Sequence, residues 1–274
     1  MTADDRTVVI VGASSKHDQD GQGDLPPEAR WGLGGALALA FAKEGFHIVL
    51  TSRRVSVLEQ LAEEVRKLQD PKYQTICVSC DVTQDDAVQK AFEETIKSSL
   101  PATAFIDCLI FNASPAFPPN FSFGQSAPKA HELDPAYMTH SFDVSVNGLI
   151  RCLKYVIPGM EERKRGCILL SGATMQLRGG ANFAALAPGK TALRSLGQSM
   201  FQAYGPLGIH VCNINVDGVI DSANTRKWMG AEKLMKCDEI AQQYVAMYKQ
   251  PKTVWSFELQ ITPDWSAPTV GMRM

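Results

Sequence analysis

Small residues follow the first apolar run of the chain, in a pattern that suits the binding of a phosphate. Residues 8–11 lead directly into Gly12-Ala13-Ser14-Ser15, and Gly32-Leu33-Gly34 opens the next helical pattern. Residues without bulky side chains let backbone N–H groups and the positive end of a helix approach a pyrophosphate. The pattern also fits a plain tight turn, but its position after a strand favours a dinucleotide site. The residues expected there are Gly12, Ser14, Ser15, Gly32, Leu33 and Gly34.

Two arginines close the second apolar run, which ends Thr51-Ser52-Arg53-Arg54. A carboxylate at this position accepts hydrogen bonds from the ribose 2′-hydroxyl of NAD, whereas guanidinium groups form charge-assisted bonds with the 2′-phosphate of NADP. Because the run ends in arginines rather than an acid, we expect NADP(H) as the cofactor, with NAD(H) less favoured. Arg53 and Arg54 would then lie beside the 2′-phosphate, with Arg53 the main contact. The alternative is an exposed helix start with incidental charge.

Apolar β-rich runs alternate with helical patterns along the chain, which is typical of a parallel sheet covered by helices on both faces. The expected strands are 7–11, 47–51, 75–80, 105–112, 167–171, 210–216 and 254–261. The expected helices are 32–44, 55–68, 84–98, 134–163, 192–204 and 238–248, of which 134–163 is interrupted by Pro158. We predict an α/β fold with one doubly wound Rossmann-type parallel sheet. It forms a single domain over residues 1–274, with an insert at 16–31 inside the glycine-rich loop.

The composition excludes several classes of function. Lysine and arginine total 27 against 29 acidic residues, so the net charge of −2 gives no field that would attract nucleic acid or an anionic membrane. Apolar stretches such as 34–42 are shorter than the roughly 20 residues of a membrane span. The first residues lack the pattern of a signal peptide, and the seven cysteines form no disulfide framework. We expect a soluble cytoplasmic protein that binds a small-molecule substrate, and neither nucleic acid nor membrane.

Cys77 and Cys80 have the C-x-x-C spacing of some metal sites. They fall in the expected strand 75–80, where residues three apart point to opposite faces of the sheet. We therefore expect no metal at this pair.

Three polar or proline-rich segments, 16–30, 114–135 and 222–236, interrupt the alternation. Each follows a strand, and loops at the carboxyl ends of strands surround the ligand crevice of a doubly wound sheet. The last two segments carry apolar side chains that would suit a lipophilic substrate, or that pack the loops onto the body of the protein. These side chains are Phe117, Phe121, Phe123, Trp228 and Met229.

With residues 16–31 left out, the first loop reads G-A-S-S-G-L-G, and the chain resembles the short-chain dehydrogenase/reductase family. The family pattern T-G-x-x-x-G-x-G matches with valine in place of threonine, and the similarity continues through C-D-V at 80–82, F-N-A-S at 111–114, Asn147 and Lys190. The resemblance implies a nicotinamide cofactor and a homodimer or homotetramer. The cofactor contacts that it implies are Asp81 and Val82 at the adenine, Asn112 and Ala113 at the strand edge, Lys190 at the nicotinamide ribose, and Gly218 and Val219 at the nicotinamide amide.

The catalytic residues depart from the family pattern. Members use Asn, Ser, Tyr and Lys, with the tyrosine four residues before the lysine; the phenol transfers the substrate proton, and the lysine lowers the pKa of that phenol. Asn147 and Lys190 fit this pattern, but position 186 is leucine. The wider spacing of related enoyl reductases gives Phe183 instead. Neither Leu186 nor Phe183 can transfer a proton.

The family serine falls on Gly172 or Ala173, so Ser171 or Thr174 would have to substitute for it. Asp217 and Asp221 follow the sixth strand, where a carboxyl group with a raised pKa could donate a proton. Aspartate beside glycine is also ordinary turn chemistry.

Two hypotheses follow. The first is an NADP(H)-dependent oxidoreductase acting on a carbonyl, an alcohol or an activated double bond, with Asn147, Ser171 and Lys190 around the nicotinamide. A water molecule or an unidentified group would supply the proton. The second is a nucleotide-binding sensor or assembly subunit with little or no turnover, which Leu186 favours.

Overall fold

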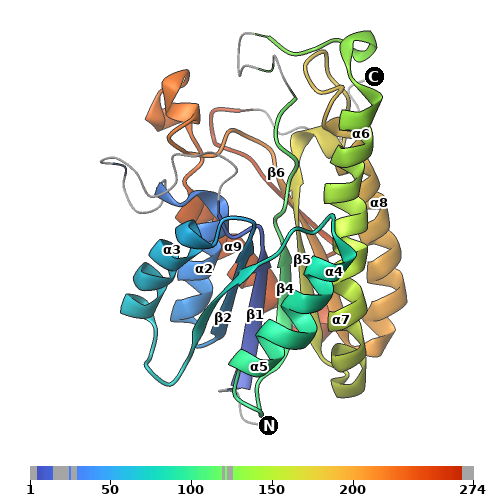
Figure 1. Cartoon of the computed structure of the whole chain (residues 1–274). Helices are drawn as coiled ribbons and strands as arrows, with labels where there is room; N and C mark the ends of the chain where they lie inside the picture. Colours follow the sequence, from blue (N-terminus) through green and yellow to red (C-terminus); the bar gives the residue numbers. More distant parts are fainter. Residues whose placement is uncertain (1–4, 15–24, 26–29, 119–120, 122–125, 267–274) are drawn as a thin grey trace.

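The computed structural model describes residues 5–14, 25, 30–118, 121 and 126–266. Seven parallel strands in this part of the chain form one sheet in the order β3-β2-β1-β4-β5-β6-β7 (Figure 1). The order reverses between β1 and β4, as in a doubly wound sheet, so the predicted fold class is confirmed. The strands are β1 (Arg6–Val11), β2 (His47–Ser52), β3 (Thr75–Ser79), β4 (Phe105–Phe111), β5 (Gly166–Ala173), β6 (Ile209–Val216) and β7 (Glu258–Ile261).

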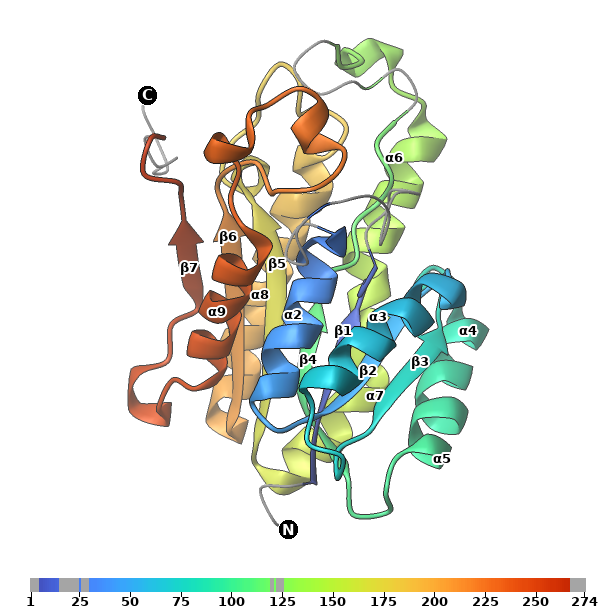
Figure 2. The same ribbon diagram turned by 90° about the vertical axis from the view of Figure 1, so that its left-hand side faces the viewer.

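Helices cover both faces of this sheet (Figure 2). One face is covered by α2 (Gly32–Lys43), α3 (Val55–Leu68) and α9 (Cys237–Tyr248). The other is covered by α4 (Asp85–Gln89), α5 (Lys97–Ser99), α7 (Gly148–Arg163) and α8 (Ala187–Tyr204). Helix α6 (Pro135–Phe142) continues the line of α7 beyond the carboxyl edge of the sheet (Figure 1).

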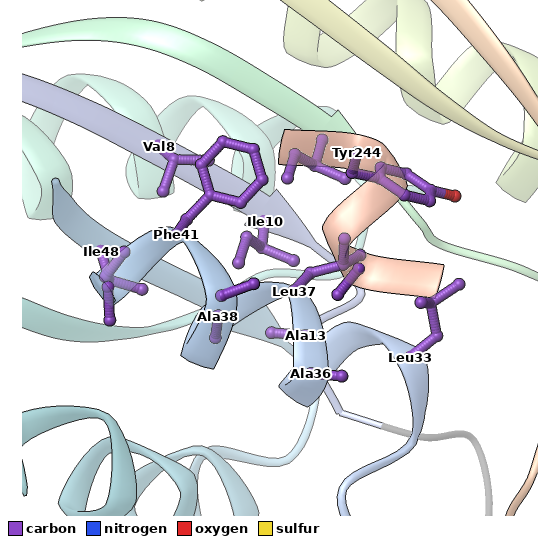
Figure 3. Close-up of a cluster of buried hydrophobic side chains, with 14 of the residues drawn as sticks. Val8, Ile10, Ala13, Leu33, Ala36, Leu37, Ala38, Phe41, Ile48 and Tyr244 are labelled. Carbon is purple, nitrogen blue, oxygen red and sulfur yellow. The ribbon is translucent and has the colours of Figure 1, made fainter. Parts of the chain in front are cut away.

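The alternation of side chains along β1 divides the core into two layers. Val8 and Ile10 pack on the side of α2 and α9, whereas Val9 and Val11 pack on the side of α7. Figure 3 shows Val8 and Ile10 in the first layer, together with Tyr244 of α9. A strand buried on both faces must be apolar at every position, which is why this run predicts a central strand.

Three expected elements differ in the structure. Residues 134–163 form α6 and α7 joined by a π-helical segment, η4 (Asp143–Asn147), and Pro158 lies inside α7 without ending it. Of the expected strand 254–261, only Glu258–Ile261 pairs with β6. The preceding residues turn instead, because the Val254 N–H donates to the Pro251 carbonyl at 3.0 Å. The expected helix 84–98 also contains a π-helical segment, η2 (Lys90–Ile96), between α4 and α5.

Cys77 and Cys80 lie on opposite faces of the sheet, as their spacing predicts. Cys77 packs against the layer under α2, and Cys80 is buried in the layer under α7. The described residues contain no group of three or more side chains arranged to hold a metal ion. None of the helices described is long and apolar enough to cross a membrane.

Candidate functional site

A cavity of about 920 Å³ lies at the carboxyl edge of the sheet, against the ends of β1, β2, β4, β5 and β6. It joins nearly all of the residues expected to bind the cofactor. Ser15 lies outside the described residues, as does most of the insert 16–31. The expected site residues that line the cavity are Gly12, Ser14, Gly32, Leu33, Gly34, Arg53, Arg54, Asp81, Val82, Asn112, Ala113, Ser171, Lys190, Gly218 and Val219.

The glycine turn after β1 has no room for side chains. Gly12 has a φ of +86°, a backbone conformation that favours glycine. A methyl group on Gly34 would lie 2.4 Å from the Gly12 carbonyl oxygen, because α2 begins directly against the turn. Asn112 holds the turn from the end of β4 by donating its side-chain amide to the same carbonyl at 2.9 Å. This bare backbone at a helix start fits the pyrophosphate of a dinucleotide.

The end of β2 is basic. Arg53 is exposed and Arg54 is half-buried, and both line the cavity. The Arg54 N–H donates to the Ser52 hydroxyl at 3.1 Å, which shapes the turn into α3. Asp81, after β3, accepts hydrogen bonds from the N–H of Thr83 at 3.0 Å and from its hydroxyl at 2.8 Å. Two guanidinium groups therefore border the cavity where β2 ends.

Lys190 lies in the first turn of α8 and is 9% exposed. Its ammonium group donates a hydrogen bond to the Ser171 carbonyl oxygen at 2.9 Å. Burial lowers the pKa of Lys190 from its ordinary value of 10.5 to about 8, because the apolar surroundings disfavour the charged form. An ammonium group has three donors, so Lys190 can also bind an acceptor inside the cavity.

Two expected catalytic side chains point elsewhere. The Ser171 hydroxyl is hydrogen-bonded to the Tyr244 phenol at 2.8 Å, in the core layer under α9, so Ser171 offers its carbonyl rather than its hydroxyl to Lys190. Asn147 donates its side-chain amide to Asp143 at 2.9 Å. It lines an outer hollow beside α6 and the start of α8, and not the cavity. Both placements differ from the expectation that these side chains surround the nicotinamide.

Leu186 takes the place of the family tyrosine and forms part of the cavity wall with Phe183. The nearby hydroxyl of Thr174 donates to Asp217 at 2.6 Å, and the other carboxylate oxygen of Asp217 accepts from Gln260 at 2.8 Å. Thr174 and Asp217 are therefore engaged with each other at the end of β5 and β6. The wall itself is apolar at the position where the family carries its phenol.

The loop after β6 is closed at its base. The Met235 N–H donates to the Val219 carbonyl at 2.8 Å, and the Asp221 N–H donates to the Met235 carbonyl at 2.9 Å, beside a β-bridge between Ile220 and Met235. Asp221 is buried, and its two oxygens accept hydrogen bonds of 2.6 Å from Arg226. Both carboxylate oxygens of Asp221 are therefore occupied by Arg226.

Aromatic rings also line the cavity. Phe117 and Phe121 stack with their centroids 4.4 Å apart and their planes 8° from parallel, and Trp228 lines the cavity from the loop after β6. Tyr137 of α6 ties the Phe117 loop down by donating its hydroxyl to the Ala116 carbonyl at 2.9 Å. Phe123 lies outside the described residues. The described aromatic residues therefore make this part of the cavity lipophilic.

Sequence reasoning missed His140, an exposed residue of α6 that lines the cavity. Val144, one helical turn further on, also lines the cavity. The available signal was a histidine within two turns of the loop 114–135, which was expected to border the ligand crevice.

The sheet order and the bare glycine turn, together with the cavity beside β1 and β4 where the strand order reverses, define a dinucleotide-binding α/β protein. A sequence model of the short chain dehydrogenase family matches residues 29–233, more than half of the 274 residues, and the chain belongs to this family. Its members are oxidoreductases that bind nicotinamide cofactors. The resemblance seen in the sequence is thereby confirmed.

Individual relatives are distant. The very-long-chain 3-oxoacyl-CoA reductase of Aspergillus clavatus is 29% identical over 181 residues, which are 66% of this chain and 48% of the relative, so the chain spans about half the length of that relative. The cis-4-hydroxycyclohexanecarboxylate dehydrogenase of Sinomonas cyclohexanicum is 25% identical over 253 residues, 87% of each chain. The alcohol dehydrogenase of the archaeon Thermococcus sibiricus, complexed with 5-hydroxy-NADP, shares the fold. Its TM-score is 0.75 at 20% identity, over 96% of this chain and 99% of that one.

Proposed function

We propose that the protein is an NADP(H)-dependent oxidoreductase acting on a carbonyl, an alcohol or an activated double bond of a lipophilic small molecule. The observation that carries this proposal is one cavity that reaches from Arg53 and Arg54, past the glycine turn, to Lys190 and the apolar wall at Leu186. A nicotinamide cofactor bound there would supply or accept a hydride.

Different parts of the cavity would hold different parts of the dinucleotide. The bare turn that Asn112 fixes would place the pyrophosphate at the start of α2, where the first backbone N–H groups have no acceptor within the helix. Guanidinium groups at the end of β2 would bind the 2′-phosphate. The remaining proposed contacts are Asp81 and Val82 at the adenine, Ala113 at the strand edge, and Gly218 and Val219 at the nicotinamide amide.

Lys190 would bind the nicotinamide ribose. With a pKa of about 8, its ammonium group remains mostly protonated at pH 7 and acts as a hydrogen-bond donor. The Ser171 carbonyl fixes the position of this ammonium group at the end of β5. We therefore propose that Ser171 is a positioning residue that acts through its backbone.

Apolar side chains at the substrate end would exclude water and favour a lipophilic substrate. They include the stacked pair Phe117 and Phe121 and the wall residues Phe183 and Leu186. Two relatives are named for activities on a 3-oxoacyl-CoA and on a cyclic hydroxy acid, which supports a carbonyl or an alcohol as the reacting group.

The cofactor choice is tested with Arg53→Ala, using Lys97→Ala of α5 as a charge-matched control outside the cavity. The loss of a charge-assisted bond worth about 1.5–3 kcal/mol should weaken NADPH binding by roughly 10- to 150-fold and leave NADH binding unchanged. Quenching of protein fluorescence measures both affinities. NADPH affinity that is unaffected by Arg53→Ala, or tighter binding of NADH by the wild type, would contradict the proposal.

Leu186 and the engaged hydroxyl of Ser171 favour a second candidate function, that of a nucleotide-binding sensor or assembly subunit with little or no turnover. NADPH consumption across a panel of ketones, enones and quinones separates the two. Binding of NADPH without consumption by any compound in the panel would favour the sensor.

We also propose a homodimer or homotetramer in the cytoplasm, as the family resemblance implies. Phe142 of α6 and Ile150 of α7 are 43% and 41% exposed, and would be covered by a second copy. Light scattering coupled to size-exclusion chromatography measures the mass, and a monomer at micromolar concentration would contradict this assembly. Cell fractionation tests the location.

A further inference from the structure

His140 lies in the last turn of α6, on a wall shared by two hollows of the protein. It lines the cavity that also contains Leu186 and Lys190, and it lines the outer hollow beside Asp143. Its side chain is exposed. His140 therefore borders both the proposed substrate space and the outer hollow.

A close contact joins the end of α6, which carries His140, to the first turn of α8, which follows Leu186. A methyl group on Gly189 would lie 3.6 Å from the Ser141 hydroxyl oxygen, so the two helices approach each other at these residues. His140 is the neighbour of Ser141 in the chain, whereas Leu186 and Lys190 lie on either side of Gly189, and all three side chains line the cavity. His140 and Leu186 thus lie on the two chain segments that meet at this contact.

Two charged groups that line the cavity are already engaged. Lys190 donates to the Ser171 carbonyl, and the carboxylate of Asp221 is bound by Arg226. Within the described residues, the ring of His140 has no hydrogen-bond partner. An imidazole can both donate and accept a proton, so it can serve as a general acid.

We propose that His140 donates the proton to the substrate oxygen, in place of the family's phenol; this inference rests on the proposed function. As the carbonyl carbon gains a hydride, the electron pair of the C=O π bond moves to oxygen. That oxygen forms a bond to the proton as the imidazolium N–H bond breaks. The ketone is reduced by two electrons, the dihydronicotinamide is oxidised by the same two, and neutral His140 regains a proton from water through the outer hollow.

Charged groups surround His140 on several sides. In the outer hollow, burial alone would raise the pKa of Asp143, but hydrogen bonds and the charges of Arg151 and His140 lower it below its ordinary value. Lys190 faces the cavity from α8, and Asp221 faces it from the loop after β6. The titration of Asp143 and of Lys190 therefore enters any pH profile of the reaction.

The test compares His140→Asn with His131→Asn, a matched control in the exposed turn η3 (Ala130–Glu132), outside the lining of the cavity. With NADPH and α-tetralone, or the ketone of the panel that the wild type reduces fastest, His140→Asn should lower kcat by roughly 10²- to 10⁴-fold. His131→Asn should leave kcat unchanged. NADPH affinity and the melting temperature should be preserved in both variants, which shows that the cofactor site and the fold are intact.

A combined variant, His140→Asn with Leu186→Tyr, restores a proton donor at the family position. It should recover kcat by about tenfold or more over His140→Asn. The alkaline limb of its pH–rate profile should move to higher pH, because a phenol with an ordinary pKa near 10 replaces an imidazole. A merely structural role for His140 would produce no such movement.

A readout independent of turnover is the NMR spectrum of protein labelled with ¹³C-histidine and bound to NADP⁺. Addition of α-tetralone should shift the His140 ring resonance, identified by its loss in His140→Asn, and leave that of His131 in place. Equal kcat in the wild type and His140→Asn, or a His140 resonance insensitive to the ketone, would overturn the inference and leave the proposed function standing. Wild-type protein that binds NADPH and reduces no compound of the panel would overturn both.

Discussion

Replacement of Lys190 by methionine tests whether the cavity holds its ammonium group at an energetic cost. Burial lowers the pKa of Lys190 from 10.5 to about 8, a difference that corresponds to about 3 kcal/mol at 1.36 kcal/mol per pKa unit. Below pH 8 the lysine is protonated in the folded and the unfolded chain, so the folded protein bears the full free-energy cost of burying the ammonium group. Between pH 8 and pH 10.5 the folded protein has lost this proton and the unfolded chain retains it, so the stability of the wild type rises with pH.

Urea unfolding of the cofactor-free protein at pH 7 and pH 10 measures this effect. Lys190→Met removes the charge and also the hydrogen bond to the Ser171 carbonyl, worth about 1.5–3 kcal/mol, so the two proteins should have similar stabilities at pH 7. By pH 10 the wild type should gain about 2–3 kcal/mol over the variant. Lys97→Met, at an exposed lysine of α5, should show no such change. A difference between the wild type and Lys190→Met that is equal at both pH values would refute the burial argument.

Two further substitutions test the glycine turn and the serine. Gly34→Ala places a methyl group 2.4 Å from the Gly12 carbonyl oxygen, so the start of α2 must shift, and NADPH affinity measured by fluorescence should fall on the order of 100-fold; unchanged affinity would remove this turn from the cofactor site. Tyr244→Phe leaves the Ser171 hydroxyl buried without its partner, so the free energy of unfolding in urea should fall by about 1–3 kcal/mol while kcat is unchanged. A large loss of kcat at normal stability would instead place that hydroxyl in the chemistry.

Local residue patterns were sufficient to predict the sheet and several of the residues that line the cavity. The run V-V-I-V of β1 is apolar at every position because both of its faces are buried, so its type follows from the sequence, although β1 begins at Arg6, one residue before the expected start. Gly12 and Gly34 were predictable because the signal is the missing side chain itself. Arg53 and Arg54 were predictable because the end of a parallel strand lies at the ligand edge whatever surrounds it.

Side-chain directions at the catalytic end could not be predicted in this way. The direction of the Ser171 hydroxyl depends on Tyr244, which lies 73 residues further along the chain and reaches the serine only through packing of α9. The direction of Asn147 depends on the π-helical segment η4, whose wider turn rotates each residue away from its α-helical position. The position of His140 depends on the approach of α6 to α8 at Gly189, and the spacing of apolar residues does not predict this contact.

The closed base of the loop after β6 separates two tasks of the protein. Gly218 and Val219, the proposed contacts of the nicotinamide amide, precede the bridge between Ile220 and Met235, whereas Trp228 lies beyond it. Because backbone bonds at the bridge hold Val219 in place, the tip of the loop can change in length or sequence without moving the cofactor contacts. The tip therefore behaves as an exchangeable module. Natural variation or directed evolution can alter the choice of substrate there, while the affinity for the dinucleotide is inherited unchanged.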